Sequence, residues 1–196
     1  MKRPNFIKYL TNSLLLVFVL LFVSGCNQSE YSRLVKTEMA KDQIYDSLFM
    51  TMEFGITKQE FFNRCWKLNK QELVKQGPRN NFVEYKLIDK EDVDKTITML
   101  FYGTFNDEKI MTGLDLKFYY EAWSLWNKSL HSDVLLEVVQ DSLNSWFPGN
   151  DFIKVDLKNQ KEVLVKIDGN RRILIEPLKD NREIDARIDD LRYIIR

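Results

Sequence analysis

The chain has 196 residues, with equal numbers of basic and acidic residues and a formal net charge of zero at pH 7. Without a basic surplus, this composition argues against a nucleic-acid-binding protein. Two cysteines and one histidine provide no paired His/Cys spacing of the kind that structural metal sites use.

The first residues have the pattern of a bacterial secretion signal. Lys2, Arg3 and Lys8 come before any acidic residue, and ten apolar residues follow from Leu14 to Val23. A membrane-spanning helix needs about 20 apolar residues, so this run is short for a permanent anchor. The pattern predicts a signal peptide.

The end of the apolar run, Val23-Ser24-Gly25-Cys26, resembles the lipobox of bacterial lipoproteins. The resemblance implies that diacylglycerol is attached to the Cys26 sulfur, that the chain is cut after Gly25, and that the new amino terminus is acylated. Two or three acyl chains suffice for stable anchoring. We therefore expect a lipoprotein signal peptide over residues 1–25 and a lipidated cysteine with its tether over residues 26–33. The alternatives are a plain secretory signal with an incidental Cys26, or an uncleaved anchor.

The processed protein is expected to lie in the bacterial cell envelope, facing the periplasm or the exterior. Processing removes three basic residues and no acidic one, which leaves a net charge near −3. Some lipoproteins are held at the inner membrane by an aspartate after the lipidated cysteine. Asn27 occupies that position here, which favours the outer membrane.

The rest of the chain predicts an α+β protein with two units, residues 34–130 and 131–196. In the first unit we expect one helix over residues 31–53 and a second that begins after Thr57. Thr57 and Glu60 form a capping box, and Gly77-Pro78 ends the second helix. Its apolar residues are expected to pack as one broad face against a sheet: Phe61, Phe62, Cys65, Trp66, Leu68 and Leu73.

Strands are expected over residues 81–88, 96–105 and 110–123, and a short turn makes the last two antiparallel. The second unit predicts a helix over 133–146, strands near 152–157, 162–167 and 171–178, and a closing helix with a capping box formed by Asp180 and Glu183. That closing helix would bury Ile184, Ile188, Leu191 and Ile195. Each unit is thus a helix followed by three strands, with an antiparallel sheet covered by helices on one face.

This order of elements resembles the fold of the β-lactamase inhibitor proteins, which are built of two helix-and-sheet repeats. Residues 54–62, Phe-Gly-Ile-Thr-Lys-Gln-Glu-Phe-Phe, also resemble the helix opening of the small accessory lipoprotein of the outer-membrane barrel-assembly machine. The second resemblance covers residues 46–76. The duplicated half and the long aromatic third strand depart from it.

Candidates for chemistry are few. Cys65 is expected to be a small buried side chain; a reactive thiol would need a base, and His131 lies far away in the sequence. The acidic run over residues 89–94 lacks the glycine and terminal glutamate of a calcium loop, so a solvated loop is expected.

Asp-Ser-Leu at residues 46–48 and 141–143 matches a short O-glycan acceptor, with Ser47 the better candidate. No phosphate loop or nucleophile elbow is present, so we expect no enzyme, cofactor or metal.

The aromatic sequence from Phe118 to Trp126 supplies a candidate interaction surface. Side chains alternate along a strand, so Phe118 and Tyr120 should face the core, while Tyr119 and Trp123 should lie on the other side. If the helices cover only one face, then Tyr119, Trp123 and Trp126 form an exposed binding patch. The alternative is burial of both faces.

These observations predict a membrane-anchored envelope lipoprotein that acts as a non-enzymatic interaction or assembly module for an envelope protein. A binding module for a small hydrophobic ligand or glycan is the alternative. A hydrolase that uses scattered acidic residues ranks last, because no pattern pairs them.

Overall fold

The structure is a computed structural model that describes residues 29–78, 82–156, 162–176 and 178–195. From Leu34 onwards the described residues belong to one compact unit. The predicted signal peptide and Cys26 lie outside the described residues.

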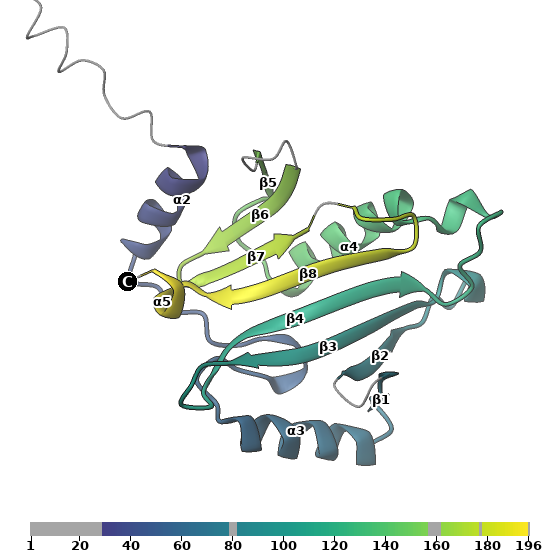
Figure 1. The fold of residues 1–196 in the computed structure, drawn as a ribbon, viewed down its shortest axis with the longest axis horizontal. Helices are drawn as coiled ribbons and strands as arrows, with labels where there is room; N and C mark the ends of the chain where they lie inside the picture. The colour runs from purple at the N-terminus through teal and green to yellow at the C-terminus, as the bar shows by residue number, and fades with distance from the viewer. Residues whose placement is uncertain (1–28, 79–81, 157–161, 177, 196) are drawn as a thin grey trace, which may run out of the picture. The chain divides into compact units, whose positions relative to one another are not determined.

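The chain forms an eight-stranded antiparallel sheet with a few helices, which confirms the predicted α+β class (Figure 1). The helices are α2 (Glu30–Met39), α3 (Lys58–Lys70), α4 (Ser132–Trp146) and the short α5 (Leu191–Ile194). The strands are β1 (Lys75–Gln76), β2 (Val83–Leu87), β3 (Ile97–Phe105), β4 (Met111–Tyr120), β5 (Ile153–Asp156), β6 (Glu162–Asp168), β7 (Arg171–Ile175) and β8 (Glu183–Asp190). Their order in the sheet is β1-β2-β3-β4-β8-β7-β6-β5. Four strands rather than three therefore follow α3 and α4, and β4 pairs with β8 where the two halves meet.

Most of the closing segment is the strand β8, so the helix predicted there was wrong except for the short α5 that follows. β8 lies in the middle of the sheet, between β4 and β7. Asp180 does accept hydrogen bonds from two backbone N–H groups, but it stabilises a turn that leads into the strand. Ile184, Ala186 and Ile188 are buried and alternate with charged residues, which is the two-residue period of a strand.

The first predicted helix, over residues 31–53, was too long, because α2 ends at Met39. Asp42 has a φ of 50°, and Met50 and Thr51 also have positive φ values. An α-helix cannot continue through this backbone conformation. The apolar residues after α2 therefore belong to an irregular segment that includes a short 3-10 turn, Phe49–Thr51.

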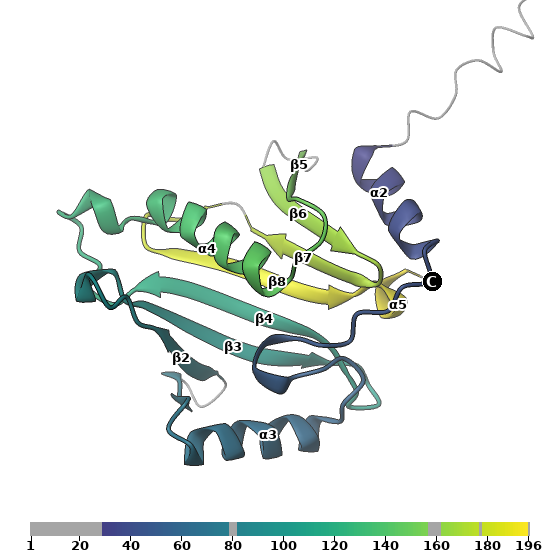
Figure 2. The same cartoon turned by 180° about the vertical axis from the view of Figure 1, so that it is seen from behind.

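The main hydrophobic core lies on one face of the sheet, while Leu100, Val165 and Ile167 are buried on the other face. Buried side chains of α3 and α4 join the same core as alternate residues of the central strands. Figures 1 and 2 show α4 crossing β8 and β4, whereas α3 lies along the edge of the sheet near β3. The core residues of the central strands are Ile97, Met99, Phe101, Leu114, Leu116, Phe118, Tyr120, Ile184, Ala186 and Ile188.

The opposite face of the central strands carries charged side chains that pair across the strands. Arg187 contacts Asp115 at 2.7 Å, and Lys117 lies 2.5 Å from Glu183 and 2.8 Å from Asp185. These pairs lie on the same face of β4 and β8 as Tyr119, which stands opposite Glu183.

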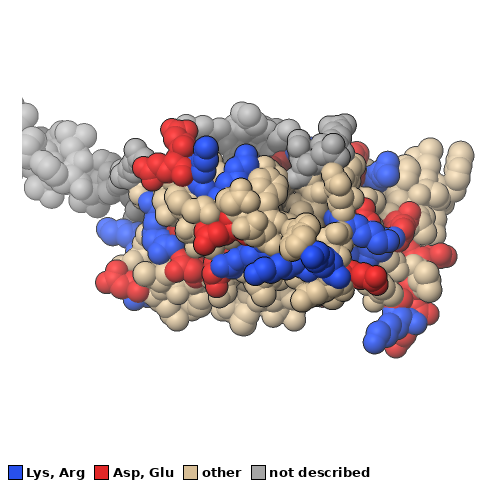
Figure 3. Space-filling view, turned by 90° about the horizontal axis from the view of Figure 1, so that it is seen from below, with Lys and Arg blue, Asp and Glu red and all other residues tan. Residues whose placement is uncertain are grey.

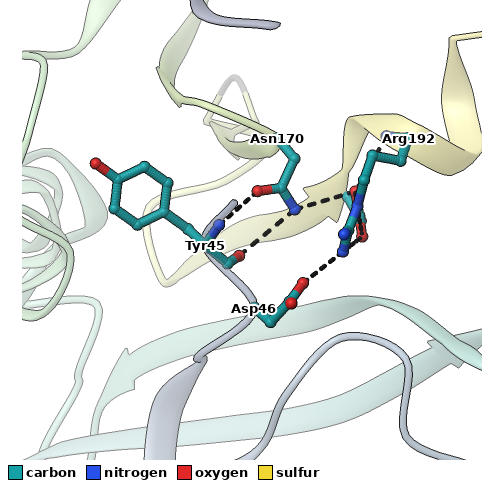
Figure 4. A network of polar contacts seen from close by, with 5 residues as sticks. Tyr45, Asp46, Asn170 and Arg192 are labelled. Carbon is teal, nitrogen blue, oxygen red and sulfur yellow. Dashed lines mark hydrogen bonds and ion pairs between the residues drawn. The ribbon is translucent and has the colours of Figure 1, made fainter. Parts of the chain in front are cut away.

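A buried polar network fastens the segment after α2 to the β6–β7 turn and the end of β8 (Figure 4). The side chain of Asn170 accepts a hydrogen bond from the Tyr45 backbone N–H at 2.6 Å and donates one to Asp190 at 3.1 Å. Asp190 is completely buried and also accepts from Arg192 at 2.9 Å, while Arg192 reaches Asp46. The chain that enters the folded unit is thus held at one end of the sheet.

Candidate functional site

Two of the three aromatic residues predicted as an interaction surface contact the same cation. The guanidinium of Arg182 lies over both the Tyr119 ring, at 5.7 Å, and the Trp123 ring, at 5.3 Å. The indole N–H of Trp123 donates to the Asn181 carbonyl at 3.0 Å. Trp126 is 90% exposed in the loop that follows and takes part in neither contact. The structure therefore joins Tyr119 and Trp123 through Arg182.

Two aromatic residues on α3 are also exposed. Phe62 is 44% exposed and Trp66 is 59% exposed, so the prediction that both are buried with Phe61 was wrong. Only the stripe of Phe61, Cys65 and Leu68 is buried, because α3 lies along the edge of the sheet. Each residue turns a helix by about 100°, so the neighbouring stripe of Phe62 and Trp66 points away from the core.

The exposed stripe borders a groove of about 340 Å³ between α3 and the β1–β2–β3 edge. Phe61, Phe62 and Trp66 line it on the helix side, and Val74, Phe82 and Tyr102 line it opposite. The Tyr102 ring packs at a steep angle against Phe61, at 5.8 Å between ring centroids, and against Phe82, at 6.3 Å. The groove thus has aromatic walls that are already packed against one another.

Two local features place α3 along this groove. Thr57 accepts a hydrogen bond from the Glu60 backbone at 3.2 Å, and Glu60 accepts one from the Thr57 backbone at 2.7 Å. This confirms the predicted capping box, whose backbone hydrogen bond lowers the pKa of Glu60. A Cβ on Gly103 would lie 2.7 Å from the Phe105 ring and 3.3 Å from the Phe61 ring. The glycine therefore lets these rings approach β3.

Cations stand at both ends of the exposed aromatic stripe. Lys58, Phe62, Trp66 and Lys70 follow one another at four-residue spacing, which places them on one side of a helix. The Lys70 Nζ lies 3.7 Å from the Trp66 ring centroid, and the Lys58 Nζ lies 6.0 Å from that of Phe62. These distances are typical of cation–π contacts.

The helix as a whole is basic. α3 contains four basic residues and one acidic residue. Figure 3, which views the molecule from the side where α3 lies in Figure 1, shows a row of Lys and Arg side chains across this surface. This combination was not predicted, although the four-residue spacing of Lys58, Phe62, Trp66 and Lys70 is visible in the sequence.

The other candidates for chemistry are buried or already contact neighbouring groups. Burial raises the pKa of the Cys65 thiol to about 12, so this side chain remains protonated at neutral pH. His131 lies beside Trp123, with 6.4 Å between the ring centroids. Asp89 accepts hydrogen bonds from the backbone of its own loop. Among the described residues, no group of three or more His, Cys, Asp or Glu could hold a metal ion.

In the part of the chain that the structure describes, no helix is both long enough and apolar enough to cross a membrane. Comparisons of this chain with protein-family models, with curated proteins and with solved structures find no match.

Proposed function

We propose that this chain is a lipid-anchored protein of the bacterial cell envelope that binds another protein through α3 and the groove beside it. The main support for this binding site is the exposure of Phe62 and Trp66 at the wall of an aromatic groove. Exposed aromatic side chains beside an apolar hollow are typical of protein interaction sites, and tryptophan is enriched among the residues that dominate binding energy.

The proposed anchor rests on the sequence Val23-Ser24-Gly25-Cys26 and on the short apolar run before it. From Cys26 to Leu34 an extended chain spans at most about 28 Å. A lipid at Cys26 would therefore keep the folded unit close to the bilayer. The outer membrane, with the folded unit facing the periplasm or the exterior, is the proposed location.

The anchor is tested by metabolic labelling with a radioactive or alkyne-bearing fatty acid. Cys26→Ser should abolish the label and leave the longer precursor, because the acceptor sulfur is gone. Cys65→Ser is the matched control and should keep both labelling and processing. Label that persists in Cys26→Ser would show that the anchor is wrong.

The binding site is tested by a detergent pull-down of the tagged full chain from its own membranes, with mass spectrometry to identify bound proteins. Trp66→Ala should lose the partner, because Trp66 borders the groove. Trp126→Ala removes a still more exposed tryptophan and should keep the partner. Circular dichroism and thermal melting establish that both variants fold. Loss of the partner in Trp126→Ala alone would place the interface elsewhere.

A small hydrophobic ligand or glycan is the second candidate for the groove. A volume of about 340 Å³ is at the small end of the range for ligand pockets, and Lys75 and Gln76 add polar groups to the lining. Native mass spectrometry of protein purified from cells separates the two functions. A bound small molecule that is lost from Trp66→Ala and retained by Trp126→Ala would favour the ligand-binding function. A co-purified protein that is lost from Trp66→Ala and retained by Trp126→Ala would favour the interaction module.

A further inference from the structure

A second groove continues the first along the same edge of the molecule. It also measures about 340 Å³, and Val74 and Lys75 line both grooves. Leu73 and Ile88 line the second groove and are exposed, Ile88 by 68%. We call this surface the edge strip and define it by its exposed apolar residues, Phe62, Trp66, Leu73 and Ile88.

Part of the β2 backbone beside the edge strip has no strand partner among the described residues. β1 pairs only with Val83 and Glu84 of β2. The outer side of β2 from Tyr85 to Leu87 therefore has no strand partner among the described residues. An unpaired edge flanked by apolar side chains is a template for a strand from another molecule. When an edge pairs with the same edge of an identical chain in antiparallel fashion, the two chains are related by a two-fold axis.

The edge strip carries opposite charges at its two ends. At one end lies the basic helix α3, where Lys67 and Lys70 are exposed. Beyond Ile88, at the other end, residues 89–94 contain four acidic residues and one lysine. Val93 lies within this acidic segment and is 75% exposed. In an antiparallel pair of identical strips, each acidic segment faces the basic helix of the other copy.

We infer that the partner at the edge strip is a second copy of this chain, bound in a two-fold symmetric dimer with each acidic segment against the other copy's α3. The inference rests on the proposed function, because it names the partner at the same surface. Charge complementarity between the ends, the exposed apolar side chains along the two grooves and the unpaired edge of β2 all point to the same occupant. Opposite charges that face each other across an interface fix the register and the orientation of the two partners.

Charge reversal on full chains tests the dimer directly. Two differently tagged copies are co-expressed, extracted in mild detergent and purified through one tag. Lys67→Glu with Lys70→Glu makes both ends of the strip acidic, and Glu91→Lys with Asp94→Lys makes both ends basic. Each double variant should co-purify with itself at least tenfold less than the wild-type copies do, because like charges then meet. Mixing the two double variants should restore co-purification, because each altered end meets its complement.

Lys128→Glu is the control, since it reverses an exposed charge in the turn before α4 that lines neither groove, and it should leave the wild-type pairing unchanged. Light scattering of the wild-type chain in detergent should give the protein mass of two copies. A one-copy mass at all concentrations, or a mixture of the double variants that does not associate, would overturn the dimer. If the dimer is absent but a different membrane protein is lost from Trp66→Ala, the edge strip binds that protein, and the inference is wrong while the proposed function stands.

Discussion

Cys65 lies in the wall of the groove, and its burial should make the thiol unreactive. Burial raises the pKa of its thiol to about 12, and only the thiolate attacks alkylating reagents. We predict that iodoacetamide at pH 8 modifies Cys65 in the folded protein on the order of a hundredfold more slowly than in urea. Mass spectrometry of the peptide that contains Cys65 measures both rates. Equal rates would contradict the burial of this side chain.

Glu38 is the clearest case of a single charge that should make stability depend on pH. Burial opposes its ionisation, but hydrogen bonds from Lys41, at 2.6 Å, from the Asn150 side chain and from the Gly169 backbone N–H more than offset this and lower the pKa of Glu38. A carboxylate whose pKa is lowered by folding stabilises the protein above its unfolded pKa, and the contribution is lost as the pH falls through the folded pKa.

Glu38→Gln should therefore lower the free energy of unfolding at pH 7, and its difference from the wild type should shrink as the pH falls below about 4.5. Urea unfolding at pH 7, 5 and 3.5 measures this difference. Glu137→Gln is the control, because Glu137 is exposed on α4 and should leave stability unchanged at each pH. If Glu38→Gln differs from the wild type by the same free energy of unfolding at every pH, the ionised carboxylate of Glu38 is not what stabilises the protein.

At the scale of the element, α4 offers a matched pair of adjacent valines. Val139 is 1% exposed in the core, whereas Val138 is 38% exposed. Val139→Ala should lower the free energy of unfolding by about 2 kcal/mol, through lost burial and a cavity, and Val138→Ala by about 0.5 kcal/mol or less. Urea unfolding followed by circular dichroism compares them. Equal losses would mean that α4 is rotated on the sheet.

Elements were predictable where one local signal dominated. The capping box fixed the start of α3, and alternation identified β3 and β4. In β8 two signals conflicted: Asp180 and Glu183 resembled a helix cap, but Ile184, Ala186 and Ile188 alternate as in a strand. Pairing with β4 and β7 on both sides decided between them. Such pairing depends on residues far apart in sequence, which a local pattern does not contain.

The candidate site could not be predicted from the sequence, because it also depends on residues far apart in the chain. Apolar residues on α3 predicted one buried face, but the position of the helix at the sheet edge left Phe62 and Trp66 exposed. The groove also needs Phe82 and Tyr102, which come from a different part of the chain. By contrast, Trp123 was singled out by its place in an aromatic run, and the structure covers it with Arg182.

At the scale of the whole molecule, the sheet joins segments from both halves of the chain into one unit. Asn170 binds Tyr45 across 125 positions of sequence, and β8 completes the sheet begun by β4. This arrangement leaves the edge with β1 and β2 open and places α3 beside it. The lipid anchor, the envelope location and the resemblance to two-repeat inhibitor folds stay predictions.

The central claim is that the surface around α3 is the interface of a membrane-anchored protein. Its most direct test is photo-crosslinking in cells, with a benzophenone amino acid in place of Trp66 in one variant and Trp126 in another. We predict a protein adduct from position 66 in the membrane fraction, at the mass of two copies, and none from position 126. Adducts from position 126 alone, or from neither position, would contradict the claim.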